Sequence, residues 1–283
     1  MHPDRTLFAS PLVSVGVFRC PTDHPMFVDS GPTRSYCFVF PRTSLWIQHD
    51  GERAFVADPM VVTMYNPEQR YRRQSLSADG DRSDWFAVAP ALLRDVLTAY
   101  DAASADEEHR LFSFSRGPSD ADTYRLQRTV LRYVRTAKAI DTLFVEEAVV
   151  TLLSRTLANT YAARRHCRSR AAQHTTLVER ARAFLNEHYS GSASLADIAA
   201  AAGCSEFHLC RVFREHTGLT LHAYRHQLRL RRSLELVSEG SRELIDIAMA
   251  LGYASHSHFT AAFSRAFGVT PSAVRRPCIQ SIP

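Results

Sequence analysis

The chain has 283 residues, which suggests two domains of ordinary size. Its hydrophobic fraction of 45% is enough for packed cores and excludes a disordered chain. No apolar run is long enough to span a membrane, and the first residues lack the pattern of a signal peptide, so we expect a cytoplasmic protein. The net charge of +5 weakly favours a polyanionic partner.

Short segments rich in β-branched and aromatic residues occupy the first third of the chain, with turn signals such as Asp50-Gly51 and Asn66-Pro67 between them. The predicted strands cover residues 12–18, 35–40, 45–49, 54–57, 61–65 and 85–88. Many short strands at regular spacing are typical of a β-sandwich or a β-barrel.

Six cysteines are scattered through the chain without the close pairs of a structural zinc site, which fits free thiols in a reducing compartment. Cys20 and His24 are separated by three residues, and Cys37 lies in a nearby predicted strand. A thiol switch or a metal site at these three residues competes with the simpler interpretation that Cys37 is a small core residue. Aromatic residues in the strands either line a pocket for an organic effector or fill the core; these are Trp46, Tyr65, Tyr71 and Trp85.

Helices are predicted from Pro90 towards Tyr100, over residues 120–139 and over residues 143–163. The last of these has an apolar stripe at three- and four-residue steps, formed by Val149, Leu152, Leu153, Thr156, Leu157 and Tyr161. We expect this stripe to pack either on the strands or on a second copy of the chain. The segment 164–170 lacks such periodicity and is interpreted as part of an interdomain linker.

A repeated pattern occupies the last third of the chain. The segment from Leu195 to Gly203 recurs 49 residues later, from Leu244 to Gly252, with Leu-x-Asp-Ile-Ala at the start of each copy. Beyond the glycine the offset becomes 50 residues, and the matched positions are Leu209 with Phe259, Phe213 with Phe263 and Gly218 with Gly268. An internal repeat of this kind constrains the fold more strongly than local propensity does.

Each copy has the pattern of a helix-turn-helix. A short apolar helix ends at a glycine, which supplies the left-handed conformation of a C-cap. Ser205 and Ser255 then stand as candidate N-caps of a second helix. This second helix has one apolar face and one face of varied polar groups, as a helix that reads the DNA major groove requires. The alternative is two helical hairpins with merely solvated polar faces, which the presence of two copies disfavours.

With these motifs, residues 175–276 resemble the DNA-binding domain of the AraC family of bacterial transcription regulators. The matching segments are Ser205 to Phe213, Arg229, Ile247 to Tyr253, Ser257 to Phe259 and Phe267 to Arg275. The region of resemblance, residues 175–276, covers roughly a third of the chain. The resemblance implies an α+β fold with an N-terminal cupin-like β-barrel that holds an effector, a central helical pair that dimerises, and a C-terminal all-α domain with two helix-turn-helix units.

The domain boundaries expected from this resemblance are 1–118 for the barrel, 119–165 for the helical dimerisation region, 166–174 for the linker, 175–277 for the DNA-binding domain and 278–283 for the tail. Cupin enzymes bind metal through a His-x-His motif, whereas the strand region here holds only His24 and His49. We therefore expect no enzyme and no required cofactor. A metal or a small molecule as effector is left open.

The family pattern also assigns DNA contacts. Base-contacting positions are Phe207, Cys210 and Arg211 in the first copy and His256, Ser257 and Thr260 in the second. Many family members carry arginine where this chain has Ala261, so we expect weaker reading by the second copy. Contacts to the DNA backbone are expected from Ser205, Arg214, Arg225, Arg229, Ser255 and Arg275.

The sequence thus predicts an effector-responsive, sequence-specific transcription regulator that binds double-stranded promoter DNA. A homodimer is expected through residues 119–165, and RNA polymerase is a partner if the protein is an activator. The alternatives are a constitutive DNA-binding regulator with a purely structural barrel and a cupin enzyme with a helical appendage.

Overall fold

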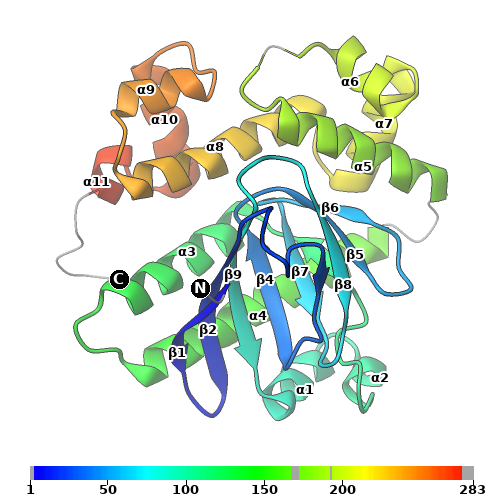
Figure 1. The fold of residues 1–283 in the computed structure, drawn as a ribbon, viewed down its shortest axis with the longest axis vertical. Helices are drawn as coiled ribbons and strands as arrows, with labels where there is room; N and C mark the ends of the chain where they lie inside the picture. The colour runs from blue at the N-terminus through cyan, green and yellow to red at the C-terminus, as the bar shows by residue number, and fades with distance from the viewer. Residues whose placement is uncertain (1–2, 167–171, 192, 276–283) are drawn as a thin grey trace. The chain divides into compact units, whose positions relative to one another are not determined.

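The computed structural model of the chain describes residues 3–166, 172–191 and 193–275. The chain separates into two compact units, residues 1–170 and 171–283 (Figure 1). The predicted tail, 278–283, lies outside the described residues, as do positions 167–171 of the predicted linker. Within the described ranges, no helix is both long and apolar enough to cross a membrane.

The strands of the N-terminal unit form two antiparallel sheets. The six-stranded sheet has the order β1-β2-β9-β4-β7-β10, and the four-stranded sheet has the order β3-β8-β5-β6. The bounds are β1 Asp4–Ala9, β2 Val13–Cys20, β3 Asp29–Ser30, β4 Tyr36–Pro41, β5 Leu45–His49, β6 Phe55–Ala57, β7 Val61–Tyr65, β8 Tyr71–Ser75, β9 Asp81–Val88 and β10 Arg116–Pro118. The expected α+β class is confirmed, while the strand pairing is that of two sheets and does not show a closed barrel.

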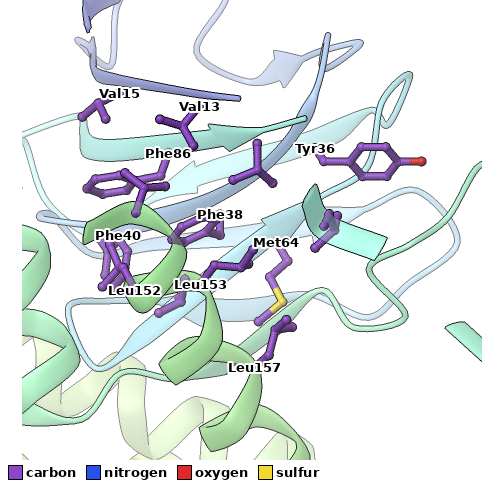
Figure 2. Packing of buried hydrophobic residues seen from close by; sticks show 14 of the residues in the cluster. Val13, Val15, Tyr36, Phe38, Phe40, Met64, Phe86, Leu152, Leu153 and Leu157 are labelled. Carbon is purple, nitrogen blue, oxygen red and sulfur yellow. The ribbon is translucent and has the colours of Figure 1, made fainter. Parts of the chain in front are cut away.

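The centre of the six-stranded sheet is built on β9, which pairs with β2 on one side and with β4 on the other. Phe86 lies opposite both Val15 and Phe38, and the Phe38 and Phe86 rings stack with centroids 5.5 Å apart. Because side chains alternate along a strand, these residues share one face of the sheet. All three of these side chains are fully buried (Figure 2).

Helices of the same unit cover this apolar face. They are α1 Pro90–Thr98, α2 Ala102–Ala105, α3 Ala121–Thr136 and α4 Thr142–His166. The stripe of α4 packs here, with Leu152, Leu153 and Leu157 beside the strand residues in one core (Figure 2). Of the two partners considered for the stripe, the structure selects the sheet. The stripe is therefore not available as a surface for a second copy of the chain.

The C-terminal unit is helical. Its elements are α5 Ala172–Glu187, α6 Leu195–Ala202, α7 Glu206–Thr217, α8 Leu221–Glu239, α9 Leu244–Ala250, α10 His256–Phe267 and α11 Pro271–Arg275. Helices α6 and α7 form one copy of the repeat, helices α9 and α10 form the other, and α8 connects the two (Figure 1).

Truncating the α4 stripe should destabilise the N-terminal unit. We predict that Leu153→Ala lowers its free energy of unfolding by about 2–5 kcal/mol, because Leu153 is fully buried and its removal leaves a cavity. Both tryptophans of the chain, Trp46 and Trp85, lie in this unit, so urea unfolding followed by tryptophan fluorescence reports on it selectively.

The matched control is Leu143→Ala, the same substitution on the same helix at a side chain that is 64% exposed. This variant should unfold close to the wild-type urea midpoint. Equal midpoints for the two variants would contradict the packing of the stripe on the sheet.

Candidate nucleic-acid interface

The two copies of the repeat fold as two helix-turn-helix units with the caps that the sequence predicts. Gly203 ends α6 in the left-handed conformation, with φ of 78°. The Ser205 hydroxyl accepts a hydrogen bond from the backbone N–H of His208, and the Ser255 hydroxyl accepts one from that of His258. Both predicted N-caps are confirmed. Because each hydroxyl is engaged by its own helix, the expected contacts of these serines with DNA backbone stay predictions.

The second helices of the two copies bury equivalent positions. Helix α7 buries Leu209, Val212 and Phe213, and α10 buries residues 50 positions later, Phe259, Ala262 and Phe263. With the buried faces fixed in this way, the opposite faces of α7 and α10 point to solvent. These are the faces that carry the predicted DNA contacts.

The exposed face of α7 holds a large aromatic side chain and two arginines. Phe207 is 81% exposed, which is unusual for an aromatic residue and leaves it free to contact an apolar group such as a thymine methyl. Cys210, Arg211 and Arg214 are also exposed on this face. The arginine fork matches the acceptors of guanine in the major groove.

Arg211 is held by its own helix in the free protein. Its Nη1 lies 3.2 Å from Oε1 of Glu215, and its Nη2 lies 3.4 Å from Nδ1 of His208. An exposed ion pair four residues apart on a helix contributes only about 0.3–0.5 kcal/mol, so it restrains the arginine without preventing exchange for a base. The spacing of Arg211 and Glu215 is visible in the sequence, but this pair is not among the sequence predictions.

The exposed face of α10 differs from that of α7. His256 and Ser257 are exposed, as the prediction requires. Thr260 is only half-exposed, and its hydroxyl oxygen is buried without a hydrogen-bond partner, so in this conformation it is not presented to a base. Ala261 is exposed at the position equivalent to Arg211, and Arg265 is the exposed basic residue of this helix. The two reading faces are therefore chemically unequal.

Arg229 of α8 joins the loop before the first copy of the repeat to the turn of the second copy. Its Nε donates to the carbonyl of Tyr189 at 2.5 Å, and its Nη2 donates to that of Gly191 at 3.0 Å, both in the loop before α6. Its Nη1 lies 3.5 Å from the carbonyl of Gly252, in the turn of the second copy. The sequence predicts Arg229 as a DNA-backbone contact, whereas the structure engages its guanidinium with carbonyls of the protein.

Gly252 is required for this arrangement. Its φ is 75°, and a Cβ built there would lie 2.5 Å from the carbonyl oxygen of Ser190. Burial lowers the pKa of Arg229, and the charge of Arg225 lowers it further, while Tyr253 opposes the shift. The cation thus stays in place because the carbonyls compensate for its lost hydration.

The other two predicted backbone arginines of this unit also have intramolecular partners. Arg225 donates from Nη1 to the carbonyl of Ala193 at 3.0 Å, and Arg275 donates from Nη2 to the carbonyl of Arg242. Both side chains are partly exposed, so their contacts with phosphate stay predictions. Arg214 is exposed on the reading face of α7.

In the N-terminal unit, the structure does not bring Cys20, His24 and Cys37 together. Cys20 lies opposite Asp81 and Cys37 lies opposite Ala87 on the same strand, β9. Six residues along a strand span about 20 Å, whereas a disulfide requires Cα atoms within about 7 Å. The hypothesis of a thiol switch between Cys20 and Cys37 is therefore wrong.

The thiol pKa values and the hydrogen bonding of these residues also disfavour a shared redox or metal site. Burial raises the pKa of the Cys37 thiol to about 12 and also raises that of Cys20, which Arg73 partly opposes. Nδ1 of His24 accepts a hydrogen bond from the backbone N–H of Met26 at 3.2 Å. No group of three or more potential metal ligands occurs in the part of the chain that the structure describes.

Of the four aromatic residues predicted to line a possible effector pocket, two are in contact with each other. Tyr65 and Tyr71 lie with ring centroids 4.9 Å apart, inside the unit and next to His49. Trp85 instead packs over Gly16 and donates from its indole N–H to Asp4 at 2.6 Å. Trp46 neighbours Ile47 on β5 and points to the opposite face of the sheet from that buried residue.

His49 is a polar residue of this interior that the sequence does not single out as a site. It is fully buried, and its Nδ1 lies 2.8 Å from Nε2 of Gln69, which donates when Nδ1 is unprotonated. Its Nε2 has no hydrogen-bond partner among the described residues. Burial lowers the pKa of His49 to about 4. The interior between the sheets thus presents a neutral imidazole beside two phenol rings.

Comparisons with known proteins match the C-terminal unit. A family model described as a helix-turn-helix domain matches residues 198–277. Regulatory protein SoxS of Escherichia coli (strain K12) is 34% identical over 102 residues, which are 36% of this chain and 95% of SoxS. Right origin-binding protein of the same organism is 37% identical over 93 residues, so the chain matches about a third, 32%, of that relative's length.

A solved structure of ToxT from Vibrio cholerae aligns with 93% of this chain and 97% of that one, at 12% identity and a TM-score of 0.37. A score this low supports no conclusion about the fold or the function of the N-terminal unit.

Removal of the Arg229 side chain should loosen the C-terminal unit. We predict that Arg229→Ala lowers its free energy of unfolding by about 2 kcal/mol, because carbonyls of the loop before α6 and of the turn at Gly252 lose a charged donor. Calorimetric unfolding of the full chain measures the effect, with the exposed Arg214→Ala as the control of equal charge. Unchanged stability together with a shallower salt dependence of DNA binding would instead place Arg229 on a phosphate.

The pKa of His49 predicts a pH dependence of stability. Between the ordinary value of about 6.5 and the folded value of about 4, the unfolded state binds more protons than the folded state. Stability conferred by the neutral ring is therefore present above pH 6.5 and is lost as the pH falls towards 4, by an amount of order 3 kcal/mol. Urea unfolding at several pH values, read by tryptophan fluorescence, should show a steeper loss for wild type than for His49→Gln. Parallel pH profiles would contradict the burial of His49.

Proposed function

Because this chain belongs to the AraC family of DNA-binding transcription regulators, a family of non-enzymes, we propose that it binds promoter DNA sequence-specifically and responds to an effector through its N-terminal unit. The observation that supports specific binding best is the exposed face of α7, where Phe207 and Arg211 stand together on a helix with a buried opposite face. An apolar group and an arginine fork are complementary to thymine methyl groups and to guanine, respectively.

In this proposal, the two copies of the repeat contribute unequally to DNA recognition. Helix α7 reads bases through Phe207, Cys210 and Arg211, and α10 contributes His256 and Ser257. Arg265 of α10 is an exposed arginine suited to a phosphate. Since reading helices of this type enter successive major-groove segments, one chain covers two segments about one helical turn apart. Most of the sequence preference then resides in the segment read by α7.

Effector binding is proposed for the interior of the N-terminal unit. The support is His49, whose buried Nε2 lacks a hydrogen-bond partner among the described residues and lies beside the rings of Tyr65 and Tyr71. A ligand with a hydrogen-bond acceptor and an apolar ring would match a buried donor flanked by aromatic side chains. An organic effector is favoured over an oxidant or a metal because Cys20 and Cys37 lie apart on the sheet. Burial also raises the pKa of both thiols, which disfavours the thiolate form that reacts with oxidants and binds metals.

A homodimer through residues 119–165 remains part of the proposal, with the surface revised. The apolar stripe of α4 is covered by the sheet, so a second copy would use the outer faces of α3 and α4. Leu143, on the outer face of α4, is an exposed apolar residue there. RNA polymerase is a partner if the protein activates transcription.

The proposal is tested by binding of the full chain to the DNA upstream of its own and neighbouring genes. We expect Arg211→Ala to weaken binding to the preferred site by about 1–3 kcal/mol and to relax sequence preference at one position, with little change on non-specific DNA. The control is Arg72→Ala, an exposed arginine of β8 in the other unit, which removes the same charge. Equal losses for both variants, or an unchanged Arg211→Ala, would remove Arg211 from the reading face.

A further inference from the structure

Arginines gather at one end of the six-stranded sheet, on the face that packs against α3. Arg19 of β2 lies directly opposite Arg82 of β9, and the backbone N–H of Arg42 donates to the carbonyl of Arg82 at 2.7 Å. On β1, Arg5 lies opposite Val17, which shares its face of β2 with Arg19. Like charges placed opposite one another on a sheet are unfavourable unless something compensates for them.

Part of the compensation comes from Asp84, which is fully buried beneath these side chains. Its Oδ2 accepts from Nη1 of Arg128 at 3.0 Å, and its Oδ1 lies 3.8 Å from Nη1 of Arg42. The Arg42 side chain is only 6% exposed and that of Arg128 is 13% exposed. At the buried base of the site, one carboxylate therefore interacts with two guanidinium groups.

Arg135 extends the group along α3. It lies seven residues after Arg128, two turns of helix, and so on the same face. The pKa of Arg135 is lowered by partial burial and, against the opposing effect of Asp84, by the positive charges of Arg128, Arg19 and Arg5. These charges from three different elements are thus close enough to act on one another.

We infer that this arginine cluster, comprising Arg5, Arg19, Arg42, Arg82, Arg128 and Arg135 around Asp84, is a binding site for a small anion with two or more phosphate groups. The planar guanidinium fork binds phosphate oxygens in pairs. Arg42 and Arg128 form a fixed, buried base, while Arg5, Arg19 and Arg135 are exposed arms that can close on a ligand. The charges of the exposed arms Arg5, Arg19 and Arg135 favour a multivalent anion over chloride or a monocarboxylate.

A small anion fits these observations better than a DNA duplex. The Arg42 and Arg128 side chains at the base of the cluster are almost fully buried, so a rigid double helix cannot contact them. The cluster also lies wholly within the N-terminal unit. Binding of a small anion to the cluster can therefore be measured in the absence of DNA.

The test is calorimetric titration of the full chain with pyrophosphate at constant ionic strength, without DNA. The double variant Arg19→Gln/Arg135→Gln removes two exposed arms and should weaken pyrophosphate binding at least about tenfold. The matched control is Arg72→Gln/Arg125→Gln, which removes two exposed arginines of the same unit, one from β8 and one from α3. This control should bind as wild type does.

Absence of a pyrophosphate site in the wild-type chain, or equal weakening in both double variants, would overturn the inference. So would loss of DNA affinity in Arg19→Gln/Arg135→Gln with no change in pyrophosphate binding, since the cluster would then contact DNA. Tryptophan fluorescence verifies that each variant is folded. Arg5→Gln, on the edge strand β1, provides a second variant that should also weaken pyrophosphate binding.

Discussion

Arg229 connects the loop before α6 to the turn of the second helix-turn-helix, and the DNA-binding unit depends on this connection. Three carbonyls, from Tyr189, Gly191 and Gly252, surround one guanidinium on the connecting helix α8. Gly252 allows the approach because a side chain at that position would collide with the backbone of Ser190. Two reading helices can address successive grooves only if the spacing between them is fixed, and a planar, permanently charged group with several donors is well suited to fix it.

The repeat explains the shared scaffold and the unequal surfaces of the two units. Buried positions are preserved at an offset of 50 residues, because the same helices must pack in the same way. The exposed positions have diverged: Arg211 with its partner Glu215 is replaced by Ala261 with Arg265. The exposed arginine of α10 lies one turn further along its helix than Arg211 does along α7. The two copies thus share their buried packing and differ in their exposed side chains.

The N-terminal unit shows where prediction from sequence works and where it stops. Helices α3 and α4 and the strands β4, β5 and β7 were predictable within a few residues, because apolar periodicity and turn signals mark them. Strand β8, Tyr-Arg-Arg-Gln-Ser, was not predicted, since Arg73 is buried through contacts with Asp81, Ser30 and two carbonyls that lie far away in the chain. A local pattern contains no information about such partners. Closure of a barrel, as opposed to two sheets, likewise depends on pairings between distant strands.

The candidate DNA-binding site likewise has some features that the sequence predicts and others that it does not. The exposed faces of α7 and α10 follow from helical periodicity, and the caps at Ser205 and Ser255 follow from residue type. The carbonyl partners of Arg229 could not be predicted, because they lie 23 to 40 residues away along the chain. The distance between Cys20 and Cys37 required the register of β9 with both neighbouring strands.

The central claim is that one chain reads DNA with two helices held at a fixed spacing. Hydroxyl-radical footprinting of the full chain on its preferred promoter site tests it most directly. For each bound chain, the account predicts protection of the DNA backbone along two major-groove segments on one face of the duplex, about 10 base pairs apart. Protection of a single segment per chain, or of DNA without sequence preference, would contradict it.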